Sequence, residues 1–175
     1  MPGDSASIAL QGHVTPDSFR LTVGSFCTGL TVISAMGPQG PVGFTCQAFS
    51  SLSVDPPRIL VCPGRASTTW PVIRGVSRFC VNVLAEDQSD LSRRFARSGG
   101  DKYAGVNWSC PPGESPRLDG ACSWLECAIE AELDAGDHFV VAARVLALDT
   151  VENRMPLLYY RGRYASLADG SSGLA

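Results

Sequence analysis

The segment from Pro41 to Ser53, PVGFTCQAFSSLS, holds the residues best suited to contact a ligand. Apolar positions in it are mixed with hydroxyl and amide side chains, which are Thr45, Gln47, Ser50, Ser51 and Ser53. A buried strand normally reads as an apolar run and a half-buried strand alternates strictly, but here the polar side chains fall on both parities. Some of them must therefore point into a cavity, where hydroxyls need hydrogen-bond partners. A flat ligand with carbonyls, ring nitrogens and a phosphate would supply them, and the alternative is a serine-rich edge strand in contact with solvent.

A second polar cluster, formed by Ser67, Thr68 and Thr69, stands just before a short predicted helix over Trp70–Arg74 that ends at Gly75. A helix N-terminus presents unpaired backbone amides, so hydroxyls beside it can form an anion site without a lysine. One of these hydroxyls can equally be an ordinary N-cap, and the two roles are compatible.

Two further polar residues belong to predicted strands. His138 follows a turn in the sequence GDH, which places an imidazole at the rim of the sheet, although a lone histidine there is more often a hydrogen-bonded structural residue. Asn82 is the only polar residue inside the strand Arg78–Leu84, where it either bonds neighbouring backbone or reaches a ligand.

The usual nucleotide-binding motifs are missing from the sequence. It contains neither GxGxxG after a strand nor GxxxxGK[ST], and the glycines of GPQGPVG (37–43) have the wrong spacing and precede a strand. Seven cysteines without a CxxC and only two histidines also argue against a metal site. Five of the cysteines lie among apolar or small residues and are predicted to be buried thiols: Cys27, Cys46, Cys62, Cys80 and Cys127.

Composition and charge exclude several classes of partner. A net charge of -3 and a pI near 5.3 argue against binding to nucleic acid or to an anionic membrane. No apolar run approaches the roughly 20 residues of a membrane span, and the first residues lack the features of a signal peptide. We therefore expect a cytoplasmic protein.

The chain is predicted to form one domain over residues 16–167, preceded by a flexible arm (1–15) and followed by a disordered tail (168–175). Strands are expected over 30–35, 41–53, 58–62, 78–84, 121–133, 138–148 and 156–167, the last with a bend at Gly162, and the first two are expected to pair antiparallel. With only short helices near 17–26, 70–74 and 87–96, the fold class is mainly β, an antiparallel barrel with a few short peripheral helices.

Some of these predictions concern single residues. Asp17 is expected to cap the first helix, and in the strand 121–133 the side chains of Glu126, Glu130 and Glu132 are expected to face solvent. The long loop over Ser98–Ser115 is expected to be anchored by Lys102, Tyr103 and Trp108.

Five segments in order resemble the short-chain flavin reductases, the NAD(P)H-dependent components of two-component flavin monooxygenases. They are FRLTVGSFCTGLTVISA (19–35), PVGFTCQAFSSLSVDPPRILVC (41–62), RFCVNVLAEDQSDLSRRFA (78–96), GDHFVVAARV (136–145) and PLLYYRGRY (156–164). The resemblance implies a Greek-key split β-barrel that binds flavin without a Rossmann domain and receives the nicotinamide against the exposed flavin face. It covers residues 19–167.

The resemblance also assigns roles to individual residues. Thr45, Cys46, Gln47, Ala48, Ser51 and Ser53 would line the isoalloxazine and ribityl groups, mainly through the backbone amides of residues 45–48, and Ser67 and Thr69 would meet the phosphates. Family members often have Asn or Ser where this chain has Gln47. His138 would contact the nicotinamide and orient it. Cys62, Thr68, Asn82 and Tyr160 complete the predicted cofactor-binding set.

The implied function is transfer of a hydride from NADH, rather than NADPH, to FAD or FMN, with diffusible reduced flavin supplied to a partner monooxygenase or halogenase. NADH is favoured because no pair of basic residues stands out to bind a 2′-phosphate. A homodimer is the family habit, and Trp70, Tyr159 and Tyr160 are apolar surfaces that a second copy would cover. Two alternatives remain: an electron carrier that keeps its flavin tightly bound, and an oxidase or haem-handling relative with the same fold.

Overall fold

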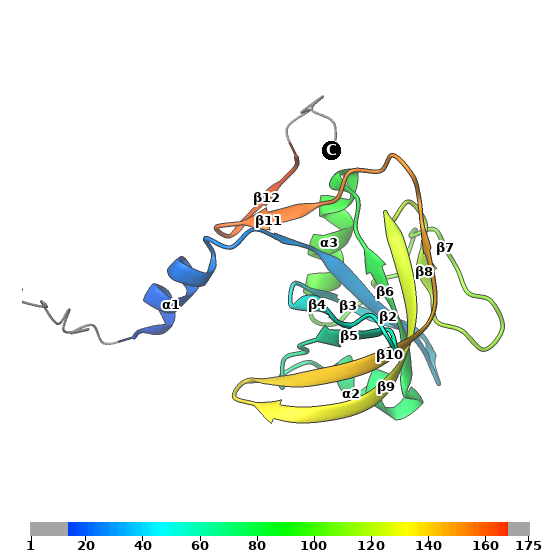
Figure 1. Ribbon diagram of the computed structural model, residues 1–175. Coiled ribbons are helices and arrows are strands. Elements are labelled where there is room, and N and C mark those ends of the chain that lie inside the picture. The colour runs from blue at the N-terminus through cyan, green and yellow to red at the C-terminus, as the bar shows by residue number, and fades with distance from the viewer. Residues whose placement is uncertain (1–13, 168–175) are drawn as a thin grey trace, which may run out of the picture.

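The computed structural model describes residues 14–167, and they form mainly antiparallel strands as predicted (Figure 1). Residues 1–13 of the expected arm and the whole expected tail lie outside the described residues. The elements, in chain order, are α1 (Pro16–Val23), β1 (Thr28–Gly29), β2 (Thr31–Gly37), β3 (Gly40–Cys46), β4 (Phe49–Ser53), β5 (Arg58–Val61), α2 (Trp70–Val76), β6 (Arg78–Val83), a 3-10 turn (Glu86–Gln88), α3 (Ser89–Ala96), β7 (Trp108–Ser109), β8 (Arg117–Leu118), β9 (Ser123–Ala135), β10 (His138–Thr150), β11 (Leu158–Tyr160) and β12 (Arg163–Ala165). No helix among the described residues has the length and apolar character needed to cross a membrane.

Seven strands form one curved sheet in the order β3-β2-β6-β9-β10-β5-β4, and the predicted antiparallel pair β2 and β3 is confirmed. The strands β3 and β4 are the two edges of this sheet, yet only Gln47 and Ala48 separate them along the chain. Because one residue spans at most about 3.6 Å, the sheet must curl until its edges nearly meet. The result is a barrel with a seam between β3 and β4. The single strand expected over residues 41–53 is therefore two strands on opposite edges.

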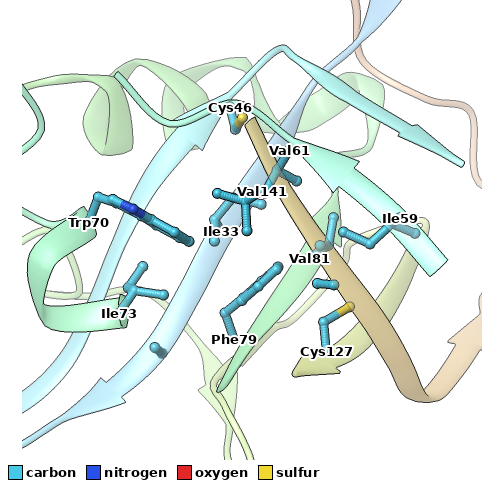
Figure 2. Close-up of a cluster of buried hydrophobic side chains, with 12 residues drawn as sticks. Ile33, Cys46, Ile59, Val61, Trp70, Ile73, Phe79, Val81, Cys127 and Val141 are labelled. Carbon is cyan, nitrogen blue, oxygen red and sulfur yellow. The ribbon is translucent and has the colours of Figure 1, made fainter. Parts of the chain in front are cut away.

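The barrel interior is filled by side chains from alternate positions of the strands and by Trp70 of α2 (Figure 2). Ile33 of β2 and Phe79 of β6 are fully buried there. Trp70 is 1% exposed, packs edge-on against Phe44 and Phe79, and donates from Nε1 to Glu132 at 2.8 Å. The expectation that Trp70 needs a second copy to cover it is wrong, because the indole closes one end of the barrel.

The outer face of β2 and β3 is buried as well, under α3 and the loop that follows it. Phe95 of α3 is fully buried against this face. Two of the predicted loop anchors are confirmed, since Lys102 Nζ donates to the carbonyls of Gly43 and Phe95 at 3.0 and 3.1 Å and the Tyr103 hydroxyl donates to Val42 at 3.0 Å. Burial on both faces explains why residues 31–35 of β2 are all inaccessible to solvent.

The strand β9 is as long as predicted, but its acidic residues are not all in solvent. Glu126 is only 2% exposed and accepts hydrogen bonds from the amide and hydroxyl of Ser115 at 3.1 and 3.0 Å. Burial raises the pKa of this carboxyl above its ordinary value near 4.5. A separate segment of the loop covers this face, which the alternation within β9 could not indicate.

At one end of the molecule, α1 projects away from the barrel and β1, β11 and β12 form a small sheet (Figure 1). The predicted last strand is a hairpin of β11 and β12, whose turn holds Arg161 and Gly162 at positive φ. The cap of α1 is Thr15, which exchanges hydrogen bonds with Ser18, and not Asp17. Cys27 is exposed in this region and not buried as expected.

Candidate functional site

A cleft of about 500 Å³ opens at the seam of the barrel. Its walls come from the end of β3, the Gln47–Ala48 link, the start of β4, the residues after β5, the first residue of β10 and the chain that leaves α1. The lining residues are Val23, Phe26, Thr28, Phe44, Thr45, Cys46, Gln47, Ala48, Phe49, Cys62, Gly64 and His138. The fold thus brings together six residues of the predicted site, Thr45, Cys46, Gln47, Ala48, Cys62 and His138.

Two polar side chains of the cleft are bonded to the protein itself, whereas the buried hydroxyl of Thr28 has no hydrogen-bond partner among the described residues. Thr45 Oγ1 donates to the carbonyl of Ser92 in α3 at 2.6 Å, and the Cys46 thiol donates to the carbonyl of Ala48 at 3.5 Å. In contrast, the backbone amides of Gln47 and Ala48 have no acceptor among residues 14–167. The cleft therefore offers a ligand the backbone amides of the link and the hydroxyl of Thr28, a residue that the sequence analysis did not single out.

Neither thiol in the cleft is suited to act as a nucleophile. Burial raises the pKa of Cys46 to about 11, and burial also raises the pKa of Cys62 above its ordinary value. Both cysteines are therefore protonated at neutral pH, whereas covalent chemistry requires the thiolate. In the part of the chain that the structure describes, no three His, Cys, Asp or Glu side chains come together as a metal site.

His138 is the one titratable side chain in the cleft other than the thiols. It begins β10 and forms a β-bridge with Gly64, on the segment that follows β5. Its Nδ1 lies 2.8 Å from the carboxylate of Asp137, and this hydrogen bond holds the pKa of Asp137 below its ordinary value. The carboxylate favours a proton on Nδ1, which leaves Nε2 on the side of Gly64 and the cleft.

The Ser67–Thr69 cluster lies at a second, smaller pocket of about 210 Å³, which Thr68 and Thr69 line together with Pro41, Val42, Gly43, Gly99, Gly100, Asp101, Lys102 and Tyr103. Gly43 lines this pocket and the next residue of β3, Phe44, lines the cleft, so the two pockets lie on opposite faces of the strand. The hydroxyl of Ser67 accepts hydrogen bonds from the amides of Thr69 and Trp70 at 3.3 and 3.1 Å. The N-cap position of α2 is Thr69, whose side chain makes no capping bond, and Ser67, two residues earlier, accepts from the first helix amides in its place.

Lys102 is the functional candidate that the sequence did not reveal as one. It is the single lysine of the chain, it lines the pocket of Thr68 and Thr69, and its ammonium group donates to the carbonyls of Gly43 and Phe95. Burial lowers its pKa from the ordinary value. The signal available in the sequence was its place in a glycine-rich loop, SGGDKY, which predicted an anchor but not a position beside residues 68–69.

The remaining predicted residues do not line the cleft. Ser51 and Ser53 lie further along β4, and Tyr160 lies on β11 in the small sheet. Asn82 is fully buried on the outer face of β6, where its amide donates to the Val32 carbonyl and the Ser34 hydroxyl. The assignment of Asn82 to cofactor binding is not compatible with this position. The alternative given for Asn82, a structural side chain that bonds neighbouring backbone, agrees with it.

The chain shares both its sequence and its fold with known proteins. The sequence family described as flavin reductase like domain matches residues 23–168. The reductase subunit of a flavin-dependent monooxygenase from Rhodococcus jostii is 42% identical over 165 residues, which cover 94% of this chain and 84% of that protein. The structure of nitrilotriacetate monooxygenase component B from Mycobacterium thermoresistibile matches with a TM-score of 0.86 at 42% identity and covers 91% of this chain and 90% of that one. The NADH:FAD oxidoreductase of Streptomyces globisporus, solved with NAD and FAD fragments, matches with a TM-score of 0.85 at 30% identity over 91% of this chain and 99% of that one. The matched residues 23–168 include every residue that lines the cleft.

Proposed function

The chain belongs to the flavin reductase-like domain family, and we propose from this premise that it passes a hydride from NADH to FAD or FMN and releases the reduced flavin to a separate oxygenase. The observation that carries the proposal is the seam cleft, which joins unpaired backbone amides, aromatic walls and His138 in one place. Such a site suits a reaction in which the protein aligns two cofactors and contributes no acid, base or nucleophile.

The residues of the cleft fit a flavin ring. Its volume of about 500 Å³ lies within the usual range of cofactor sites, and Phe44, Phe49 and Phe26 supply apolar walls for a flat aromatic group. The amides of Gln47 and Ala48 are free to donate to ring carbonyls or nitrogens. The pocket lined by Thr68, Thr69 and Lys102 supplies the hydroxyls of the predicted phosphate contact, and the ammonium of Lys102 is bonded to the carbonyls of Gly43 and Phe95. A bound flavin supplies the acceptor of the two-electron transfer.

The side chains of the cleft bind the cofactors and orient them. Cys46 and Cys62 stay protonated, so they are inert neighbours of the ring. His138 presents Nε2 to the cleft and holds the nicotinamide amide by a hydrogen bond, without moving an obligatory proton. The variant His138→Asn is expected to raise the KM for NADH several-fold while flavin affinity stays the same, and an unchanged KM for NADH would count against this role.

NADH is the preferred donor in this proposal. Arg65 and Arg74 lie over the ring of Phe139, next to His138 in the chain, and each is paired with a carboxylate, Asp134 and Glu132 respectively. Neither has a free charge for the 2′-phosphate of NADPH. The ratio of kcat/KM for NADH and NADPH measures this preference, and equal values for the two would overturn it.

A second copy of the chain completes the molecule. The helix α1 buries none of its residues, and Phe19 and Leu21 are 57% and 72% exposed. Val23 and Phe26 border the cleft, so a partner that covers α1 would also close one wall of the flavin site. Sedimentation equilibrium should give a dimer, and Leu21→Glu should shift it toward the monomer.

All seven cysteines are free thiols, which supports a reducing compartment, the cytoplasm.

The direct test of the function is NADH oxidation at 340 nm with and without added flavin. We expect turnover that rises and saturates with free FAD or FMN, because the cleft is open to solvent and the flavin is a diffusible substrate. Loss of NADH oxidation, with a yellow protein that retains its flavin through gel filtration, would favour the electron carrier instead.

A further inference from the structure

The turn that carries His138 is an exposed tip, so something outside it must hold the imidazole at the cleft. Residues 134–138, which end β9, form the turn and begin β10, are all exposed to solvent. Two main-chain hydrogen bonds attach the tip to the segment after β5: the Phe139 amide donates to Pro63, and the Arg65 amide donates to Asp137, both at 2.9 Å. These bonds flank His138 on either side, and the β9–β10 ladder pairs His138 with Ala135, so Gly136 and Asp137 form the unpaired tip of the hairpin.

The side chain of Arg65 reaches that outer part. Its Nε donates to the carbonyl of Gly136 at 2.9 Å, and its Nη2 lies 2.5 Å from the carboxylate of Asp134. The guanidinium carbon also lies 4.9 Å from the ring centroid of Phe139. Arg65 therefore contacts the turn both before and after His138, and the planar fork of a guanidinium is suited to hold two acceptors at fixed angles.

Arg65 itself is not among the residues that line the cleft. Its neighbour Gly64 lines the cleft and forms the β-bridge with His138, and the Ser67 amide donates back to the Gly64 carbonyl at 3.0 Å. The residue thus lies between the loop that caps α2 and the turn that carries His138, and it contacts His138 only through the turn.

We propose that Arg65 is a positioning residue for the nicotinamide, which fixes the turn 134–137 so that His138 faces the flavin cleft. The inference rests on the proposed flavin reductase function and adds to it a residue that acts through His138. An exposed arginine–carboxylate pair contributes little to the stability of a fold. Removing the side chain of Arg65 is therefore expected to weaken the binding of NADH and to leave the free energy of unfolding unchanged.

The test compares five variants by their KM for NADH, their kcat and their dissociation constant for flavin: Arg65→Ala, Arg65→Lys, Arg74→Ala, His138→Asn and the double variant of Arg65→Ala with His138→Asn. Arg65→Ala should raise the KM for NADH several-fold, and by no more than His138→Asn does because Arg65 acts through His138, while the flavin constant and the melting temperature stay unchanged. Arg65→Lys should behave like Arg65→Ala, because an ammonium keeps the charge but loses the fork. Arg74→Ala is the matched control, since Arg74 also lies over the Phe139 ring, at 4.8 Å, but contacts Glu132 and not the turn. Arg65→Ala in a His138→Asn background should add almost nothing to the single His138→Asn effect.

Two results would overturn the proposal. An effect of Arg65→Ala that is fully additive with His138→Asn, or restored by Arg65→Lys, would mean that Arg65 contacts the dinucleotide directly as a charge. An unchanged KM for NADH in Arg65→Ala would mean that the turn needs no support. Hydrogen exchange of a peptide covering residues 134–140 gives a readout independent of activity. It should speed up in Arg65→Ala and not in Arg74→Ala, even if the wild-type protein fails to oxidise NADH and the proposed function is wrong.

Discussion

Replacing Asn82 by alanine removes a group of hydrogen bonds that joins the outer face of the barrel sheet to the loop above it. The side-chain amide donates to the Val32 carbonyl at 3.2 Å and to the Ser34 hydroxyl at 2.9 Å, and its oxygen accepts from the Leu118 amide at 2.8 Å. Asn82 is fully buried and Leu118 is 4% exposed, so no water replaces the lost partners. A buried polar group without a partner costs about 1–3 kcal/mol, and at least the Leu118 amide is left in this state.

With the cavity added, we expect Asn82→Ala to lower the free energy of unfolding by about 3 kcal/mol. For a chain of this length that corresponds to a fall in Tm of about 6–12 °C. Urea unfolding followed by tryptophan fluorescence measures the change, and flavin affinity and the KM for NADH are measured on the same samples. Asn107→Ala makes the same chemical change at an exposed position and should stay within about 0.5 kcal/mol of wild type. The reasoning is refuted if Asn82→Ala is as stable as this control, or if the folded variant binds flavin more than about threefold more weakly, since Asn82 lies away from the cleft.

Two other changes test the packing and the buried charge. Gly43→Ala places a methyl group 2.8 Å from the Phe95 ring and 3.0 Å from the Ile33 carbonyl, so it should destabilise the fold by about 1–3 kcal/mol in urea unfolding; Gly29→Ala, where nothing lies within 4 Å, should be neutral, and equal stability of the two variants would contradict the packing described. Burial raises the pKa of Glu126 in the folded state above its ordinary value near 4.5. Between the ordinary and the folded pKa, the folded state therefore binds more protons than the unfolded state. The stability that the protonated Glu126 contributes is lost as the pH rises through the folded pKa. Glu126→Gln keeps an acceptor for the Ser115 amide and should remove this loss of stability at rising pH. Melting temperatures measured from pH 4 to 8 would show the difference, and the same pH dependence in the variant and the wild type would argue against a buried carboxyl at this position.

Much of the fold was predictable because its signals are local. The long strands β9 and β10, the turn between them and the β2–β3 pair follow from alternation and turn residues. The division of residues 41–53 into two strands was not, because Gln47 and Ala48 carry no turn signal and the separation depends on which strands occupy the sheet edges. The choice of Asp17 as the cap of α1 was a different kind of error, because the correct cap is readable in the sequence. Thr15 is followed by Pro16 at the first helical position and forms a capping box with Ser18.

For the site, the residues on one continuous segment were the predictable part. Thr45 to Ala48 meet in the cleft because they are neighbours in the chain. Lys102 and Asn82 show what local pattern cannot supply. The position of Lys102 beside Thr68 and Thr69 depends on how a long loop returns over α3, and the role of Asn82 depends on the segment 115–118 lying above β6. In each case a partner far away in sequence decides whether a polar residue is structural or functional.

The seam explains why a flavin can be held with so few specific side chains. An open sheet edge carries unpaired amides and carbonyls, which proteins normally cover to avoid edge-to-edge association. Here the two edges of one sheet approach each other, and the two-residue link between them leaves the amides of Gln47 and Ala48 facing the cleft. A ligand with acceptors along one side satisfies these amides and covers the edge at once. Since these two donors belong to the backbone, Cys46 and Ala48 can line the cleft without offering a ligand a side-chain hydrogen bond.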